Sequence, residues 1–147
     1  MSGMTEVSEV STQDENAQVM SEMIQMICGI NNRTDSVLTV KSEHLEWGKW
    51  EDVGNFPPVA IPAKTNKAAF RSSGRQGSAS GTQGNVVYQL GDDPNAIITI
   101  TWDVTWASGA KNTVSASTFN EDVSASVEGF VGSGPVESVT IKVVDGR

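Results

Sequence analysis

The chain has 147 residues, of which 37% are hydrophobic and 19% charged, and its formal net charge is −8. This length fits one domain with a single packed core, and the acidic balance excludes a nucleic-acid partner, whose phosphates it would repel. The same balance disfavours attraction to anionic lipid but is compatible with a zwitterionic headgroup. Ser, Thr, Val, Gly and Asn are abundant and Leu is scarce, which favours an all-β fold.

An acidic mobile tail is expected over residues 1–17, ahead of one domain over residues 18–147. Residues 1–32 contain five acidic residues and no Lys or Arg, and the first part shows no hydrophobic periodicity. No positively charged segment followed by an apolar run indicates a signal peptide. No apolar run reaches the roughly 18 residues of a transmembrane helix. We therefore expect synthesis in the cytoplasm without a signal peptide, and release by another route if the protein acts outside the cell.

Residues 19–31 combine two hydrophobic patterns. One has the spacing of a helix, at Met20, Met23, Ile24 and Ile27, and the other alternates like a strand, at Ile24, Met26, Cys28 and Ile30. We predict a strand from about Glu22, because its Asn31-Asn32 ending suits entry into a turn. Residues 36–45 then form a second strand, and the two are expected to pair as a hairpin. Cys28 is the only cysteine, so no internal disulfide can form, and a buried, inert thiol is expected.

The prolines of residues 51–66 indicate an irregular or edge segment, because proline removes a ladder donor. Further strands are expected at residues 67–72, 85–90, 114–119, 123–127 and 139–143, with a glycine-rich loop over residues 73–84. The strongest strand pattern lies at residues 97–106, where one face carries Ile98, Ile100, Trp102, Val104 and Trp106. Short strands separated by turns indicate a single-domain antiparallel β-sandwich or a barrel.

Catalytic and metal-binding patterns are not evident. His44 is the only histidine and has no partner at zinc-ligand spacing, so it is expected to be a surface or satisfied residue. The glycine loop lacks the Lys-Ser/Thr ending of a P-loop, and no nucleophile elbow opens a helix. We predict that the protein is not an enzyme and holds no metal or cofactor.

Two pairs of tryptophans lie beside predicted turns, which favours a binding module. Indole faces attract choline or ethanolamine headgroups by cation–π interaction, and indoles sit well at a membrane interface. Asp103 is a candidate partner for the ammonium, and Lys49 or Arg75 for a phosphate. The candidate binding residues are Trp47, Lys49, Trp50, Arg75, Trp102, Asp103 and Trp106. The alternative stays open that the indoles form core, that Asp103 caps a turn and that Arg75 is solvated.

From about Ala17 to Asp145 the chain resembles the aegerolysins. The resemblance rests on an ordered set of pieces: Ala17-Gln18, Trp47-Gly48-Lys49, Gly74-Arg75, Gly81-Thr82-Gln83-Gly84, Trp102-Asp103, Trp106 and Asn112. It implies a β-sandwich similar to the actinoporins that recognises membrane lipid, often sphingolipid. It also implies a larger partner protein, of the MACPF type or the toxin-10 type, with which many members lyse cells.

The chain departs from that pattern at three residues. Ser80 stands where sphingolipid-binding fungal members carry Glu, Val19 where they carry Trp, and Thr105 where the family carries Pro. These departures argue against specificity for ceramide phosphoethanolamine, whereas membrane recognition in general is retained. The bacterial branch, which includes the small component of binary insecticidal toxins, is the more similar one.

The function expected from this resemblance is that of the small, lipid-recognising component of a two-component, insecticidal pore-forming toxin. One alternative is a carbohydrate-binding sandwich whose indoles stack on sugars. The other is a self-sufficient cytolysin in which residues 13–28 insert as an amphipathic helix, although its polar face would be acidic.

Overall fold

The structure, a computed structural model, describes residues 23–51, 57–75, 81–105 and 110–146. Within these ranges the chain is built from strands: β1 Gln25–Asn32, β2 Leu38–Trp47, β3 Lys49–Trp50, β4 Thr65–Ser73, β5 Thr82–Leu90, β6 Ile97–Val104, β7 Thr113–Thr118, β8 Val123–Glu128 and β9 Val136–Asp145. The predicted all-β class is therefore confirmed.

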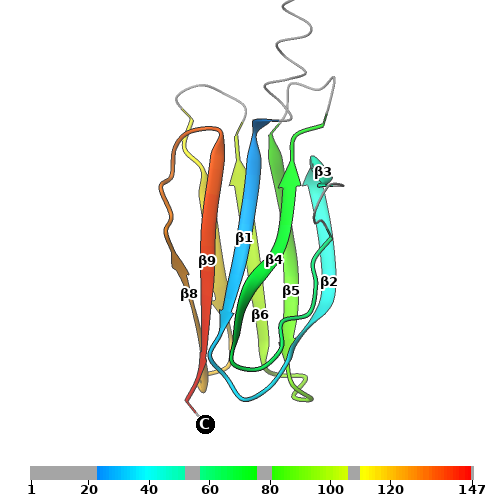
Figure 1. Cartoon of the computed structure of the whole chain (residues 1–147), viewed down its shortest axis with the longest axis vertical. Coiled ribbons are helices and arrows are strands. Elements are labelled where there is room, and N and C mark those ends of the chain that lie inside the picture. Colours follow the sequence, from blue (N-terminus) through cyan, green and yellow to red (C-terminus); the bar gives the residue numbers. More distant parts are fainter. Residues whose placement is uncertain (1–22, 52–56, 76–80, 106–109, 147) are drawn as a thin grey trace, which may run out of the picture.

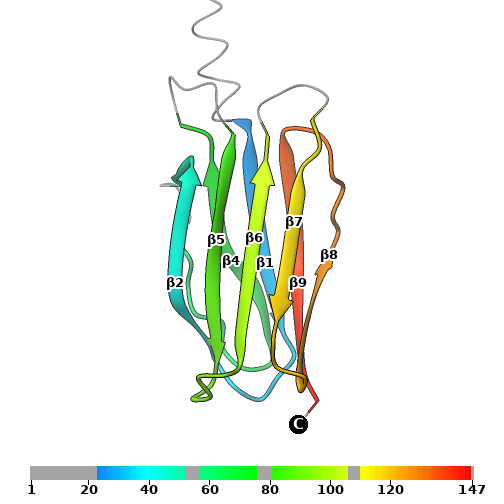
Figure 2. The same ribbon diagram turned by 180° about the vertical axis from the view of Figure 1, so that it is seen from behind.

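The strands form two sheets that stack face to face, as expected for a β-sandwich. One sheet has the order β3-β4-β1-β9-β8 and lies in front in Figure 1. The other has the order β2-β5-β6-β7 and faces the viewer in Figure 2. Neighbouring strands pair antiparallel, except that β1 runs parallel to β9 from Gln25↔Val136 to Asn32↔Val143. The first and last strands of the sandwich thus lie side by side at its centre.

The predicted hairpin between the first two strands is wrong, because β1 and β2 belong to different sheets. The turn between them forms a corner of the sandwich, and buried Asn32 holds it. The Asn32 amide donates to the carbonyls of Ser36 at 2.8 Å and Pro62 at 3.0 Å, and its Oδ1 accepts the Thr34 N–H at 3.0 Å. Leu38 also forms a bridge with Ile61. These contacts fix the turn so that the chain enters the opposite sheet, where β2 pairs with β5.

Alternation along the central strands fills the core between the sheets. Ile98, Ile100, Trp102 and Val104 on β6 are buried, as the period of two predicts, and Trp106 lies outside the described residues. Cys28 on β1 is fully buried, as predicted, and burial raises the pKa of its thiol far above the ordinary value. Burial raises the pKa of the Tyr88 phenol in the same way, and its hydroxyl donates to the Val59 carbonyl at 2.9 Å.

One end of the sandwich gathers the segments that carry the candidate binding residues. β2, β4 and β6 finish there and β1, β5, β7 and β9 begin there, as the register pairs Asp103 with Gln83 and Thr113, and Gln25 with Ser73 and Val136. We call it the Trp47 end, defined by Trp47–Glu51, Gly74–Arg75, Gly81–Thr82, Asp103–Thr105 and Asn112–Thr113. The C-terminal residues lie at the opposite end (Figure 1).

Candidate binding site at the Trp47 end

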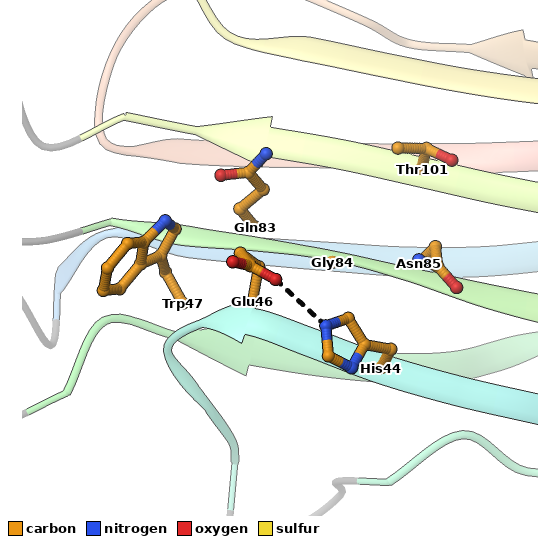
Figure 3. A pocket seen from close by; sticks show the side chains of 7 residues that line it. All are labelled: His44, Glu46, Trp47, Gln83, Gly84, Asn85 and Thr101. Carbon is orange, nitrogen blue, oxygen red and sulfur yellow. Dashed lines mark hydrogen bonds and ion pairs between the residues drawn. The ribbon is translucent and has the colours of Figure 1, made fainter.

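An exposed indole stands at the rim of a polar hollow on the outer face of the β2-β5-β6-β7 sheet. Trp47 ends β2 and is 56% exposed. The hollow beside it has a volume of about 310 Å³ and is lined by His44, Glu46, Trp47, Gln83, Gly84, Asn85 and Thr101. Figure 3 shows these side chains arranged along three neighbouring strands, β2, β5 and β6.

The lining combines one carboxylate, one imidazole, two amides and one hydroxyl. His44 Nε2 lies 3.1 Å from Glu46 Oε2, and both side chains are more than half exposed, at 62% and 58% (Figure 3). No hydrogen bond joins the side-chain amides of Gln83 or Asn85 to another described residue. Their donors and acceptors are therefore available to water or to a ligand in the hollow.

Gly48 explains why Trp47 lies on the outer face of the sandwich while Trp50, three residues later, packs against its core. Its φ of 104° falls in the left-handed region, which costs an L side chain energy but not glycine. A Cβ at Gly48 would lie 2.5 Å from the Ser73 carbonyl oxygen and 3.0 Å from Thr82. The chain therefore crosses here from β2 in one sheet to β3 in the other at very close range.

Trp50 and Trp102 form a core cluster with Phe70 beneath the hollow. The Trp102 ring lies 4.9 Å from that of Phe70 and 6.0 Å from that of Trp50, measured between centroids. Trp102 is fully buried, and its Nε1–H donates to Thr82 Oγ1 at 3.2 Å. Thr82 Oγ1 in turn lies 2.7 Å from Ser72 Oγ of the opposite sheet. The expectation that Trp102 contacts a headgroup is therefore contradicted: its ring packs in the core, and its only polar group is already satisfied.

The remaining predicted residues occupy different parts of the same end. Asp103 lies half-buried on β6, opposite Gln83, on the same outer face as the hollow. Lys49 is half-buried on β3, and Arg75 is exposed two residues after β4. Trp106 lies outside the described residues. The structure thus brings Trp47 and Asp103 to the two sides of Gln83, and places the two cations on the other sheet at the same end.

A buried carboxylate organises the far edge of the Trp47 end. Glu137 is fully buried and accepts hydrogen bonds from the N–H groups of Val131 at 2.9 Å and Gly132 at 2.7 Å. The Asn112 amide also donates to Glu137, at 3.3 Å, while its Oδ1 accepts the Thr105 N–H. This network ties the start of β9 to the segments that precede β7 and β9.

The sequence interpretation missed most of the hollow. The sequence pattern predicts a surface or satisfied residue at His44 and places Gln83 in the glycine-rich loop, although β5 begins at Thr82. Glu46, Asn85 and Thr101 are not candidates from the pattern, because alternation indicates a face but not which strands are neighbours. Within the described ranges, no group of three His, Cys, Asp or Glu side chains could hold a metal ion. No helix in the described part of the chain is long and apolar enough to span a bilayer.

Comparison with known proteins agrees with this architecture. The family model described as Aegerolysin matches residues 23–146. No curated protein matches the chain closely enough in sequence to count as a relative. Among solved structures, RahU, solved in complex with a Tris molecule, is 23% identical with a TM-score of 0.73, over 84% of this chain and 96% of its own.

Two further solved structures share the fold. IP-1A from Alcaligenes faecalis is 21% identical with a TM-score of 0.72, over 90% of this chain and 98% of its own. Nakanori, described as a lipid binding protein, is 18% identical with a TM-score of 0.59, over 93% of this chain and 80% of its own. The strands, the sandwich and the family match over nearly the whole described region agree, and the chain belongs to the aegerolysin family.

Proposed function

We propose that this aegerolysin docks its Trp47 end onto the lipid surface of a target membrane and there recruits a larger pore-forming protein. The observation that carries the proposal is the exposed Trp47 indole at the rim of a polar hollow. A large apolar ring with one N–H is suited to the boundary between hydrocarbon and headgroups. The fold neighbour Nakanori, described as a lipid binding protein, supports the choice of ligand.

Charges at the Trp47 end fit a membrane surface that presents both signs. Arg75 is exposed and Lys49 half-buried on the β4 side of the end, where lipid phosphates would meet them. Asp103 lies on the β5 side, where an ammonium would find a carboxylate. Ion pairs between these exposed side chains and lipid headgroups would be screened by salt. They would therefore orient the protein on the membrane rather than supply most of its affinity.

The core cluster contributes by holding Trp47 in place. Trp50 is anchored between Phe70 and Trp102, three residues from the exposed indole, so the β2–β3 crossing has a fixed attachment in the core. A binding side chain on a rigid element loses less conformational entropy on docking. The proposed contact residues are therefore Trp47, Lys49, Arg75, Asp103 and Trp106, with Trp50 and Trp102 acting as support.

The recruitment of a partner is supported by the resemblance of the Trp47-Gly48-Lys49 and Trp102-Asp103 pieces to a family in which many members lyse cells only with a MACPF-type or toxin-10-type protein. An insect midgut membrane is the proposed target, by resemblance to the small component of binary toxins. Lysis by this chain alone through residues 13–28 would require Gln25–Cys28 to leave β1, where each residue is paired with both β4 and β9. That cost favours the two-component scheme.

The test combines flotation and dye release. The purified chain is floated with insect midgut membrane vesicles, and release of a trapped dye is measured with and without a MACPF-type or toxin-10-type protein encoded beside its gene. The proposal predicts binding by the chain alone and release only with both proteins. Release by the chain alone, or failure to float with any midgut or lipid preparation, would contradict it.

A further inference from the structure

The lining of the hollow points to a specific class of ligand. We infer that the hollow binds a neutral sugar ring, so that the membrane component recognised through the Trp47 end carries a glycan headgroup. This inference rests on the proposed docking of the Trp47 end, and it concerns the outer face of β2, β5 and β6 rather than the end itself.

Charge argues first against a phosphate in the hollow. The lining residues include the carboxylate of Glu46 and neither lysine nor arginine. Asp103 adds a second carboxylate across from Gln83 on the same face. Among the described residues that line the hollow, the one potential cation is His44, whose Nε2 already lies 3.1 Å from Glu46 Oε2.

Hydrogen-bonding capacity argues next for a ligand with several hydroxyl groups. The amides of Gln83 and Asn85 each offer a donor and an acceptor, Thr101 adds a hydroxyl, and Glu46 accepts. A sugar presents neighbouring hydroxyls that both donate and accept, so it can use amide and carboxylate groups together. A neutral headgroup without such hydroxyls would leave these polar groups hydrogen-bonded to water, so they would add little affinity for it.

The indole completes the site. The C–H groups on one face of a pyranose ring carry partial positive charge, which suits the negative face of an aromatic ring. Trp47 stands at one end of the hollow, with the amides beside and beyond it (Figure 3). The volume of about 310 Å³ lies at the lower end of the range of small-molecule sites, about 300–1,000 Å³, and suits a single ring rather than a long chain.

Gly84 allows β2 and β5 to approach closely beneath the hollow. It faces the core on β5, and a Cβ there would meet the His44 carbonyl oxygen and lie 3.1 Å from Trp102 Cζ2. β2 and β5 are therefore pressed together directly beneath the hollow. The side chains above it are held on paired strands, His44 opposite Asn85 and Asn85 opposite Thr101.

The experiment uses the full chain and two kinds of probe. An array of neutral, sialylated and sulfated glycans reports which sugars bind. Phosphatidylcholine vesicles with and without galactosylceramide or glucosylceramide report whether a lipid-borne sugar strengthens membrane binding. The lining variants Asn85→Ala and Gln83→Ala are compared with Thr99→Ala, which lies on the same outer face of β6 but does not line the hollow.

We expect neutral glycans to bind and acidic ones to be rejected. Each lining variant should weaken binding roughly 3- to 10-fold, as expected for one lost neutral hydrogen bond, and Thr99→Ala should not. Preference for acidic glycans, or equal binding by the lining variants, would overturn the inference. Membrane binding with no response to any glycan or glycolipid would overturn the inference and leave the proposed function standing. If the parent chain binds no membrane at all, both the inference and the proposed function are contradicted.

Discussion

Trp47 and Trp50 lie three residues apart and have different environments: Trp47 is 56% exposed on the outer face of one sheet, whereas Trp50 is half-buried and packs its ring 5.9 Å from that of Phe70, which is in the core. The left-handed backbone of Gly48 separates them. The segment from Trp47 to Trp50 therefore supplies both the exposed indole proposed to contact the membrane and the indole that attaches this segment to the core. Substitutions at the two positions should have opposite consequences for binding and for stability.

Trp47→Ala should weaken membrane binding and leave the fold intact. The exposed ring contributes little to packing, so the free energy of unfolding should change by less than about 0.5 kcal/mol. Flotation with midgut vesicles measures binding, and urea denaturation measures stability. Trp102→Ala is the matched control, since loss of a buried Trp costs about 3–5 kcal/mol. A strongly destabilised Trp47→Ala variant would show that this indole is structural.

Gly48→Ala should destabilise the sandwich. The added Cβ would meet the Ser73 carbonyl oxygen at 2.5 Å and would also be strained by the positive φ. Gly134→Ala is the control, because Gly134 has a similar φ of 90° but nothing within 4 Å of the added atom. We expect about 1 kcal/mol for the control, from backbone strain alone, and clearly more for Gly48→Ala in thermal or urea unfolding. Equal costs would mean that the close approach of the two sheets at Gly48 is unimportant.

Glu137→Ala should loosen the segment between β8 and β9. It removes the acceptor of the part-buried Val131 and Gly132 N–H groups and of the Asn112 amide, and each lost hydrogen bond costs about 0.5–1.5 kcal/mol. Hydrogen exchange at Val131 and Gly132 should accelerate, and the free energy of unfolding should fall. Glu128→Ala, at an exposed position on β8, should do neither. Unchanged exchange in the Glu137 variant would rule out this role for the carboxylate.

Stability should fall at alkaline pH because of Cys28 and Tyr88. Their ordinary pKa values are about 8.5 and 10, and burial raises both in the folded chain. Above about pH 8.5 the unfolded chain therefore binds fewer protons than the folded one, so stability is complete below that pH and declines as the pH rises. Urea midpoints at about pH 7 and about pH 10.5 measure the decline.

Cys28→Ala provides the control for that decline. Removing the thiol should lower stability slightly at neutral pH, through the small cavity, and reduce the loss on going to alkaline pH. If the variant and the parent chain lose the same stability between the two pH values, the thiol is not responsible for the decline.

Local pattern predicted the strands well and their partners poorly. The alternation at residues 97–106 identified β6 and its buried face, because the period of two is a property of each strand alone. The expected pairing of β1 with β2 failed because Asn32 and its bonds to residues far along the chain turn the corner between sheets. A contact between residues about 30 positions apart cannot be inferred from the local sequence pattern around Asn32.

For the candidate site too, the sequence pattern indicated the residue types but not which residues lie together in the fold. Composition and resemblance indicated a tryptophan-bearing binding surface, but the sequence alone could not separate Trp47 from Trp102. That separation depends on the backbone of Gly48 and on the buried bond between Trp102 and Thr82. The hollow was not predictable, because its lining comes from three strands that become neighbours only in the folded chain.

The most direct test of the account asks whether the Trp47 indole enters the membrane interface. Tryptophan fluorescence of the bound protein is measured on vesicles of midgut lipid extract that contain brominated phosphatidylcholine, a quencher of nearby indoles. The account predicts strong quenching in a Trp106→Phe variant, which lacks the other proposed contact indole, and its marked reduction when Trp47→Phe is added, because Trp102 is buried and Trp50 packs against the core. Quenching of equal size in the double variant, with the protein still bound, would contradict it.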